Sequence, residues 1–358
     1  MPSLKEIKGR INSISSTLAI TSAMKMVAAA KLQKAQMAIQ NMLPYERRLH
    51  SMLIDLMGAM NISAAASEDG SVRGSGSAER GFDQSGDRLS LSNRHDLAGM
   101  DGAYSLMAQR EVRKVAIVAF ASNSSLCGAF NSNAIREATA VINEYRASGL
   151  RDSDIVVYSV GRKMAEAMKK LGFPSPADFT KMSDSPSYDA ASALAQELFD
   201  GFVSGRFDKV ELVYNHYKST SSQPTTRQTY LPLSLADATA DLHAGKIADS
   251  SSESDTNRGA EPVGAPVVRQ GSPTTEDLIV EPSKEALIAT LLPKVIRLRI
   301  FTTLLDSAAA EHAARTVAMQ LATDNGNDLL QELTLEYNKG RQQKITSEIL
   351  DLVGGSMQ

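Results

Sequence analysis

The sequence predicts an α/β fold in which a long antiparallel coiled coil of N- and C-terminal helices carries a smaller globular domain. Two observations predict the coiled coil: apolar residues recur every three and four positions over residues 3–60, and a second long helical pattern fills residues 283–358. A third concerns residues 111–235, where apolar runs alternate with amphipathic stretches. That alternation predicts a Rossmann-like α/β domain with a mainly parallel sheet.

The N-terminal coiled-coil helix is predicted over residues 1–60. Steps of three and four residues from Leu4 onward meet an apolar residue at nearly every position. A 3.5-residue repeat held for this length keeps one face of a helix against a partner helix. Pro44 lies inside the pattern and predicts a local kink. The stripe is interrupted at three polar positions: Thr21, Lys25 and Glu46.

The middle of the chain contains two low-complexity segments and a domain between them. Residues 61–110 are rich in Ser, Gly, Asp and Ala without any period, which predicts a largely disordered insertion. Residues 236–282 predict a flexible insertion and connection. Within the globular foot domain, residues 111–235, we expect strands at 112–120, 155–160, 209–217 and 226–233, and helices at 131–146, 162–171 and 188–203.

The C-terminal coiled-coil helix is predicted over residues 283–358. Small residues from Ala308 to Ala318 allow a partner helix to approach closely, and Pro293 predicts either a kink or a helix start nearby. At about 1.5 Å per residue this helix measures roughly 110 Å, against roughly 85 Å for the first. If both helices leave the same domain, the C-terminal end must project past the N-terminus.

Composition excludes several kinds of site. The single cysteine, Cys127, excludes an intrachain disulfide and a cysteine-cluster metal site, and the five histidines do not have ligand spacing. We therefore expect no metal and no cofactor. No stretch has the roughly 18 apolar residues of a membrane helix, and no signal peptide is evident. These features predict a protein of the bacterial cytosol, soluble or peripheral to a membrane.

Charge is distributed unevenly along the chain. The net charge of −3 gives no indication of nucleic-acid binding, but the first fifty residues carry eight Lys and Arg against two Glu. A basic helix face of this kind fits an acidic partner or a phosphate backbone, although a merely solvated face is about equally common.

The residues that could take part in catalysis do not form a catalytic constellation. The small-residue turn at 122–131 follows a predicted strand and could hold a phosphate, but it lacks both G-x-G-x-x-G and G-x-x-x-x-G-K-[ST], which favours a structural turn. Cys127 has no histidine nearby in sequence to activate it. Glu311 and His312 lack a second histidine at zinc-motif spacing. We therefore expect no catalytic residues. The polar C-terminal end is either a solvated helix end or a surface for transient contacts.

Several motifs resemble the gamma subunit family of bacterial F-type ATP synthases. Residues 20–32 (ITSAMKMVAAAKL) are similar to the N-terminal signature of that family. The C-terminal signature is matched by residues 311–325 and 337–349 together with 353–355, and the central landmarks by 125–128, 214–215 and 231–233. The turn departs from the family pattern, with Asn123-Ser124-Ser125 in place of Asp-Arg-Gly, and both insertions are longer than is usual in bacteria.

The resemblance implies a non-catalytic rotor shaft in a proton-translocating complex. The coiled coil would stand inside a ring of three alpha and three beta subunits, with the foot domain on the membrane c ring beside the epsilon subunit. Proton flow would turn the c ring and the shaft, which drives ATP synthesis at the beta subunits. The chain would be peripheral to the cytoplasmic face of the inner membrane, associated only through these partners. Neither insertion contains a cysteine, so the cysteine-pair switch of photosynthetic relatives is expected to be absent.

The resemblance also implies contact residues. Two sets would contact the beta subunits: Met24, Lys25, Lys31 and Lys34 near the N-terminus, and Arg315, Arg341, Gln342, Thr346 and Glu348 in the last helix. A third set would contact the c ring and epsilon: Tyr214, Asn215, His216 and Tyr217. Two alternatives are a coiled-coil adaptor that does not rotate and an α/β nucleotide-binding enzyme. The missing phosphate motifs disfavour the enzyme, and the C-terminal motif disfavours the adaptor.

Overall fold

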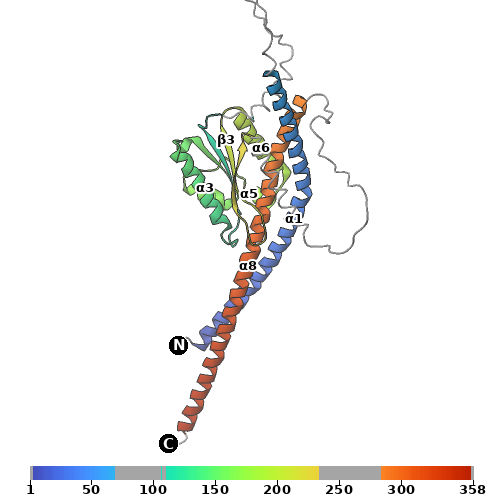
Figure 1. Ribbon diagram of the computed structural model, residues 1–358. Coiled ribbons are helices and arrows are strands. Elements are labelled where there is room, and N and C mark those ends of the chain that lie inside the picture. The colour runs from blue at the N-terminus through green and yellow to red at the C-terminus, as the bar shows by residue number, and fades with distance from the viewer. Residues whose placement is uncertain (1–2, 69–105, 107–109, 234–283, 356–358) are drawn as a thin grey trace, which may run out of the picture.

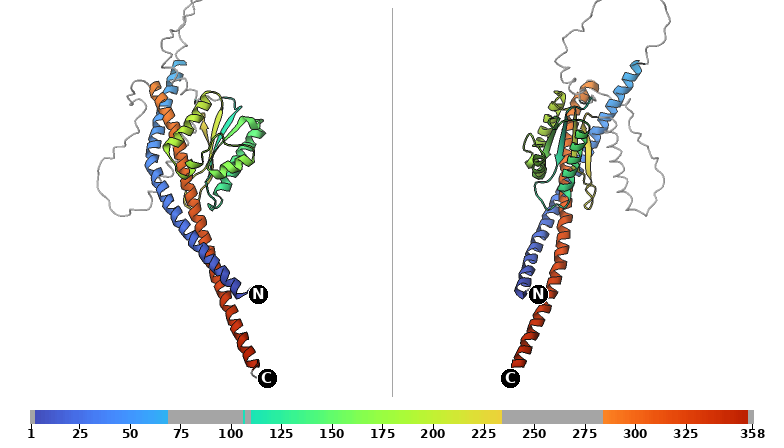
Figure 2. Two further views of the ribbon diagram at one scale, coloured as in Figure 1. Left: turned by 180° about the vertical axis from the view of Figure 1, so that it is seen from behind. Right: turned by 90° about the vertical axis from the view of Figure 1, so that its left-hand side faces the viewer.

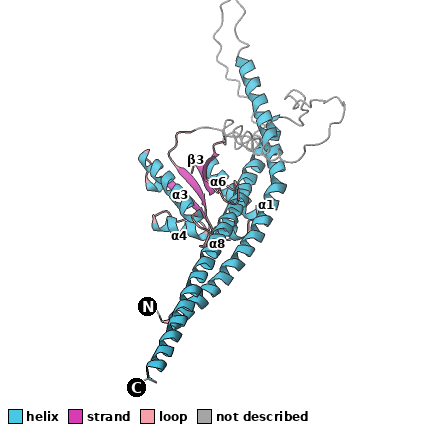
Figure 3. Cartoon of the chain, turned by 60° about the horizontal axis from the view of Figure 1, so that its bottom comes forward, coloured by secondary structure: helices cyan, strands magenta, loops and turns pink. Residues whose placement is uncertain are grey.

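A computed structural model describes residues 3–68, 106, 110–233 and 284–355 of the chain. Two long helices, α1 (Leu4–Glu68) and α8 (Lys284–Gly355), run side by side in opposite directions, and an α/β domain lies against them (Figure 1). Within the described residues, the strands belong to that domain alone (Figure 3). The predicted fold class is confirmed. The two predicted insertions lie almost entirely outside the described residues.

The register of the two long helices is constant over their free-standing part. Three pairs of facing residues define it: Thr21 with Thr323, Leu18 with Gly326 and Leu4 with Gly340. The residue numbers in each pair add up to 344, as an antiparallel pair without a register slip requires. The two threonine hydroxyls lie 3.1 Å apart and form a hydrogen bond across the seam. Glycine at two of the facing positions leaves room for the leucine side chains.

The apolar stripe predicted along α1 is its packed face. Each stripe position whose side chain is described, from Leu4 to Leu56, is buried or half-buried, including Thr21, Lys25 and Glu46. Both long helices differ from expectation at a boundary. α1 continues past Met60 to Glu68, and α8 begins at Lys284, so a helix start at Pro293 is wrong. Both prolines lie inside unbroken helices, and α1 curves around α8 (Figure 2).

The foot domain, residues 110–233 of the described chain, contains a four-stranded sheet in the order β2-β1-β3-β4. The central β1 (Val115–Phe120) is parallel to β2 (Ile155–Val160) and to β3 (Lys209–Asn215), and β4 (Thr225–Leu231) is antiparallel to β3. The prediction of a mainly parallel sheet is confirmed. The other elements are α3 (Phe130–Ala147), the 3₁₀ turn η2 (Asp152–Asp154), α4 (Arg162–Lys170), α5 (Thr180–Asp184) and α6 (Tyr188–Val203). The sequence did not predict α5.

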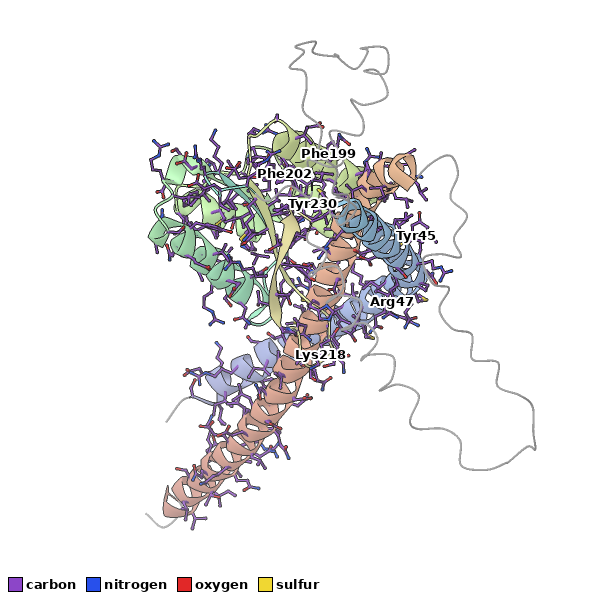
Figure 4. The ribbon with its side chains drawn as sticks, turned by 45° about the horizontal axis from the view of Figure 1, so that its top comes forward. Tyr45, Arg47, Phe199, Phe202, Lys218 and Tyr230 are labelled. Carbon is purple, nitrogen blue, oxygen red and sulfur yellow. The ribbon has the colours of Figure 1, made fainter. Side chains whose placement is uncertain are left out.

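Alternate residues of β1 build a core on each face of the sheet, because successive side chains of a strand point to opposite sides. Val115, Ile117 and Ala119 pack under α3 and α4. Ala116, Val118 and Phe120 face α6 and the first half of α8, so α8 forms part of the domain core. Phe199 and Phe202 of α6 and Tyr230 of β4 lie between α6, the sheet and α8 (Figure 4), and the Tyr230 hydroxyl donates to the Ile296 carbonyl oxygen at 2.9 Å.

Candidate functional site: the shaft surface and its junction with the foot domain

The last part of α8 has no helix beside it within the described residues. Gly340 lies against Leu4, and every described side chain from Arg341 to Val353 is exposed. We call this segment, residues 341–353, the tip. Figure 2 shows that the C-terminal end lies beyond the N-terminal end of α1, so the expected projection of the last helix past the first is confirmed.

The tip presents both polar and apolar groups. The four predicted contact residues here are all exposed: Arg341, Gln342, Thr346 and Glu348. Thr346 Oγ1 donates to the Gln342 carbonyl oxygen at 2.9 Å, and Lys344 Nζ lies 3.8 Å from Glu348 Oε1. The apolar residues Ile345, Ile349 and Leu352 are 47%, 54% and 75% exposed. Clustered exposed apolar groups mark an interaction surface.

The basic face of α1 is only partly exposed to a partner. Lys31 and Lys34 are exposed, whereas Met24 and Lys25 are half-buried, because they lie at the edge of the seam with α8. Apolar residues beside them, Ile20, Met26 and Val27, are more than half exposed, and their role in this surface was not predicted. One sequence feature could have indicated this role: Ile20 and Val27 form a second apolar pair, at seven-residue spacing, that lies off the main stripe.

Arg315 is turned into the foot domain and not toward the solvent. Its guanidinium donates to the Ser125 carbonyl oxygen at 2.6 Å, to Ser124 Oγ at 2.8 Å and to Glu311 Oε1 at 2.7 Å, and the residue is 8% exposed. Burial raises the pKa of the Glu311 carboxyl, and the Arg315 guanidinium opposes this increase. The structure therefore gives no support to Arg315 as a contact with another subunit.

The turn between β1 and α3 is stabilised by its own polar groups. Asn131 Oδ1 accepts hydrogen bonds from the amide and the hydroxyl of Ser122, both at 3.0 Å. Cys127 is buried, and Asn131 Nδ2 lies 3.2 Å from its Sγ. Arg315 donates to two oxygens at the outer part of the turn, the Ser125 carbonyl and Ser124 Oγ. These contacts support the structural interpretation of the turn.

The hairpin between β3 and β4 faces the long helices. Tyr214 and Asn215 are buried, and Asn215 Nδ2 donates to the Phe130 carbonyl oxygen at 3.1 Å. His216 Nδ1 lies 2.6 Å from Asp306 Oδ2, and the Tyr217 amide donates to Asp306 Oδ1 at 2.9 Å.

The Tyr217 hydroxyl accepts a hydrogen bond from Gln36 Nε2 of α1 at 2.6 Å. The next residue, Lys218, lies beside α8 (Figure 4). Of the four residues predicted to contact the c ring and epsilon, Tyr214 and Asn215 are thus buried, whereas His216 is exposed and Tyr217 half-buried, and both of these hydrogen-bond to the long helices. Their contact with the c ring and epsilon stays a prediction.

Glu311 and His312 do not form an acid–base or metal pair. Desolvation, with the charges of Lys31 and Arg315, lowers the pKa of His312 to about 4, so its imidazole is neutral at pH 7. Among the described residues, no group of three or more His, Cys, Asp or Glu side chains could hold a metal ion. No helix within this part of the chain has the length and apolar character needed to cross a membrane.

Comparison with known proteins agrees with this architecture over its full length. The family model described as ATP synthase matches residues 3–357. The ATP synthase gamma chain of Phocaeicola vulgatus is 47% identical, and that of Bacteroides thetaiotaomicron 45%, with all of this chain and all of the relative covered in each case. The chain belongs to the ATP synthase gamma-chain family.

A solved structure shares the fold of this gamma-chain family member. A chain of the Euglena gracilis mitochondrial ATP synthase matches with a TM-score of 0.52 at 18% identity, covering 99% of this chain and 93% of that chain. Within the ATP synthase, the gamma-chain family provides the central rotor shaft, and this chain has that role. The alternative of a coiled-coil adaptor is not favoured.

Proposed function

We propose that this shaft acts without an active site of its own, by carrying torque between a ring of three alpha and three beta subunits and a membrane c ring. In this arrangement the tip and the basic face of α1 lie inside the alpha–beta ring. The observation that carries the proposal is the exposed tip, because a helix that continues past its partner needs other surroundings for its apolar side chains.

The composition of the tip suits contacts that form and break during rotation. Arg341, Gln342, Thr346 and Glu348 offer charges and hydrogen-bonding groups that can pair with successive beta subunits. Ile349 and Leu352 offer apolar surface to the surrounding alpha–beta ring. A purely solvated helix end would not need these apolar groups.

The basic face of α1 provides a second proposed contact with the beta subunits. Lys31 and Lys34 project into solvent, and Met24 lies on the same face as Lys31 because the two are seven residues apart. We propose that these lysines, with Lys25 at the edge of the seam, meet an acidic segment of each beta subunit. Exposed ion pairs are individually weak, which suits a contact that must be released at each step.

The end of the foot domain away from the tip is the proposed site of the c ring and epsilon. There α1 ends at Glu68 and α8 begins at Lys284, whereas the hairpin with His216 and Tyr217 faces the tip side (Figure 1). Docking at this end would hold the chain at the cytoplasmic face of a bacterial inner membrane through its partners. No cofactor or metal enters this role, and no nucleic acid is needed.

Truncation after Gly340 tests the proposal. In membrane vesicles that hold the complete ATP synthase, we expect proton pumping per ATP hydrolysed to fall by about fivefold or more, the effect of a lost coupling free energy of about 1 kcal/mol. The matched control is Arg136→Ala with Glu137→Ala on α3, in the foot domain away from the tip. An unchanged ratio after truncation would contradict the proposal.

A further inference from the structure

The foot domain holds the shaft at a compact junction on its tip side. We define the junction as Asp306, Glu311 and Arg315 of α8 together with Ser124, Ser125, His216 and Tyr217 of the foot domain. Its contacts are the hydrogen bonds from Arg315 to the β1–α3 turn and from the hairpin to Asp306. Just beyond it, a Cβ on Gly128 would lie 3.8 Å from Ala318 Cβ.

Tyr217 touches all three parts that meet at the junction. Its ring packs beside Leu32 of α1 with Ala309 and Ala313 of α8, and also beside Cys127 and Phe130 of the foot domain. Its hydroxyl accepts from Gln36, and its amide donates to Asp306. One side chain therefore connects the hairpin to both shaft helices.

The polar contacts of the junction are directional. Apolar contacts between a helix and a sheet are non-directional and resist rotation weakly, whereas hydrogen bonds weaken steeply when their angles change. The buried Glu311–Arg315 pair lies within α8, where Glu311 accepts from the guanidinium that also donates to the turn, and removal of one partner would leave the other charge unpaired at a large energetic cost. The junction is therefore suited to fix the rotational setting of the foot domain around α8.

The position of the junction decides where torque enters the foot domain. Toward the tip, α8 is paired with α1 alone, so a twist applied there reaches the foot domain first at Arg315, Asp306 and Tyr217. Other hydrogen bonds between α8 and the foot domain, such as Tyr230 to Ile296 and Arg297 to Gln196, lie farther from the tip.

We infer that this junction makes the shaft and the foot domain turn as one body, with Arg315 and Tyr217 as its positioning residues. The inference rests on the proposed function, because a twist must first be applied at the tip. It assigns Arg315 a role inside the chain in place of a contact with a beta subunit.

The test compares proton pumping and ATP hydrolysis in vesicles that hold the complete ATP synthase. Arg315→Ala and Tyr217→Ala should each reduce pumping per ATP hydrolysed by about fivefold or more, with hydrolysis retained. Ser221→Ala is the control, because this exposed residue belongs to the same hairpin and its hydroxyl lies 3.3 Å from Ser219 Oγ, away from the junction residues. Equal losses of pumping and hydrolysis would indicate a role in stability alone and overturn the inference.

A disulfide that takes the place of the hydrogen bonds of the junction gives a sharper test. Gly128→Cys with Ala318→Cys, in a Cys127→Ser background, places two Cβ atoms within the separation of roughly 3.5–4.5 Å that a disulfide needs. Gly128 has a φ of +59°, where a side chain is strained, so the oxidised and reduced forms of the same protein are compared. In the Arg315→Ala chain, oxidation should restore pumping per ATP to within about twofold of the control, and a thiol reductant should reverse this.

Two further outcomes would overturn the inference: an unchanged ratio in Arg315→Ala, or no rescue once the disulfide is shown to have formed. If Arg315→Ala prevents assembly, Arg315→Lys, which keeps the charge but lacks the planar guanidinium that donates from two nitrogens, is tested in the same way. Failure of the proposed function gives a different result. In that case, truncation after Gly340 of the chain that keeps Arg315 would leave the pumping per ATP hydrolysed unchanged.

Discussion

The two halves of α8 are parts of one unbroken helix with opposite surroundings. From Lys284 to Met319 the helix packs against α1, α6 and the sheet, and even small residues such as Ala309, Ala310 and Ala313 are fully buried. From Leu321 onward most of its described side chains are exposed, with α1 packed on one face, and along the tip every described side chain is exposed. Leucines such as Leu335 and Leu350 are 66% and 65% exposed there. The same helical backbone thus serves as domain core in one half and as an open surface in the other.

The largest expected difference between the halves is in packing. Leu304→Ala removes a side chain that is 2% exposed within the core between α8 and the sheet, and we expect it to lower the free energy of unfolding by about 2–5 kcal/mol. Leu350→Ala in the tip should change it by less than about 0.5 kcal/mol. Urea unfolding of the isolated chain, followed by circular dichroism, measures both. Similar losses for the two variants would show that the tip is packed in the free chain.

A smaller effect is expected along the coiled coil, where, within the described residues, α8 packs against α1 alone. Alanine in place of a helical glycine gains about 1 kcal/mol of helix propensity. Gly9→Ala should show this gain, because nothing lies within 4 Å of the added Cβ. At Gly326 the Cβ would lie 2.6 Å from Leu18 Cδ2, so Gly326→Ala should be less stable than Gly9→Ala by about 1–3 kcal/mol. Thermal unfolding of the two variants side by side measures the difference, and equal stabilities would disprove the register.

The smallest effect is expected within the packed half of α8, where His216 meets Asp306. The hydrogen bond to Asp306 raises the pKa of His216 above its ordinary value, against the effects of desolvation and of Lys218. A raised folded pKa means that the pair stabilises the protein fully below the unfolded pKa of about 6.5. This contribution is lost as the pH rises through the folded pKa.

The matching variant is His216→Gln. Its loss of unfolding free energy relative to the unmodified chain should be greater at pH 6 than at pH 9, and below about 1 kcal/mol because the side chain is half exposed. A loss that does not depend on pH would mean that the imidazolium form is not what stabilises the hairpin.

Local patterns predicted most of the elements, and contacts between distant residues account for what they missed. The stripe of α1 and the bounds of β2 and α6 follow from periodicity, which is a property of neighbouring residues. Arg315 lies 190 positions from Ser125, and Tyr217 lies 181 positions from Gln36. No local pattern indicates that such residues meet, and for this reason the sequence did not show that Arg315, Tyr214 and Asn215 are buried. The i,i+4 spacing of Glu311 and Arg315 was the one available sign of a buried pair.

The position of Arg315 has a consequence for the turn between β1 and α3. The foot domain keeps the strand–turn–helix layout that many α/β proteins use to bind a phosphate, but in this chain the turn already holds a cation whose charge Glu311 offsets. A layout that holds a ligand in other proteins therefore joins two parts of one chain here.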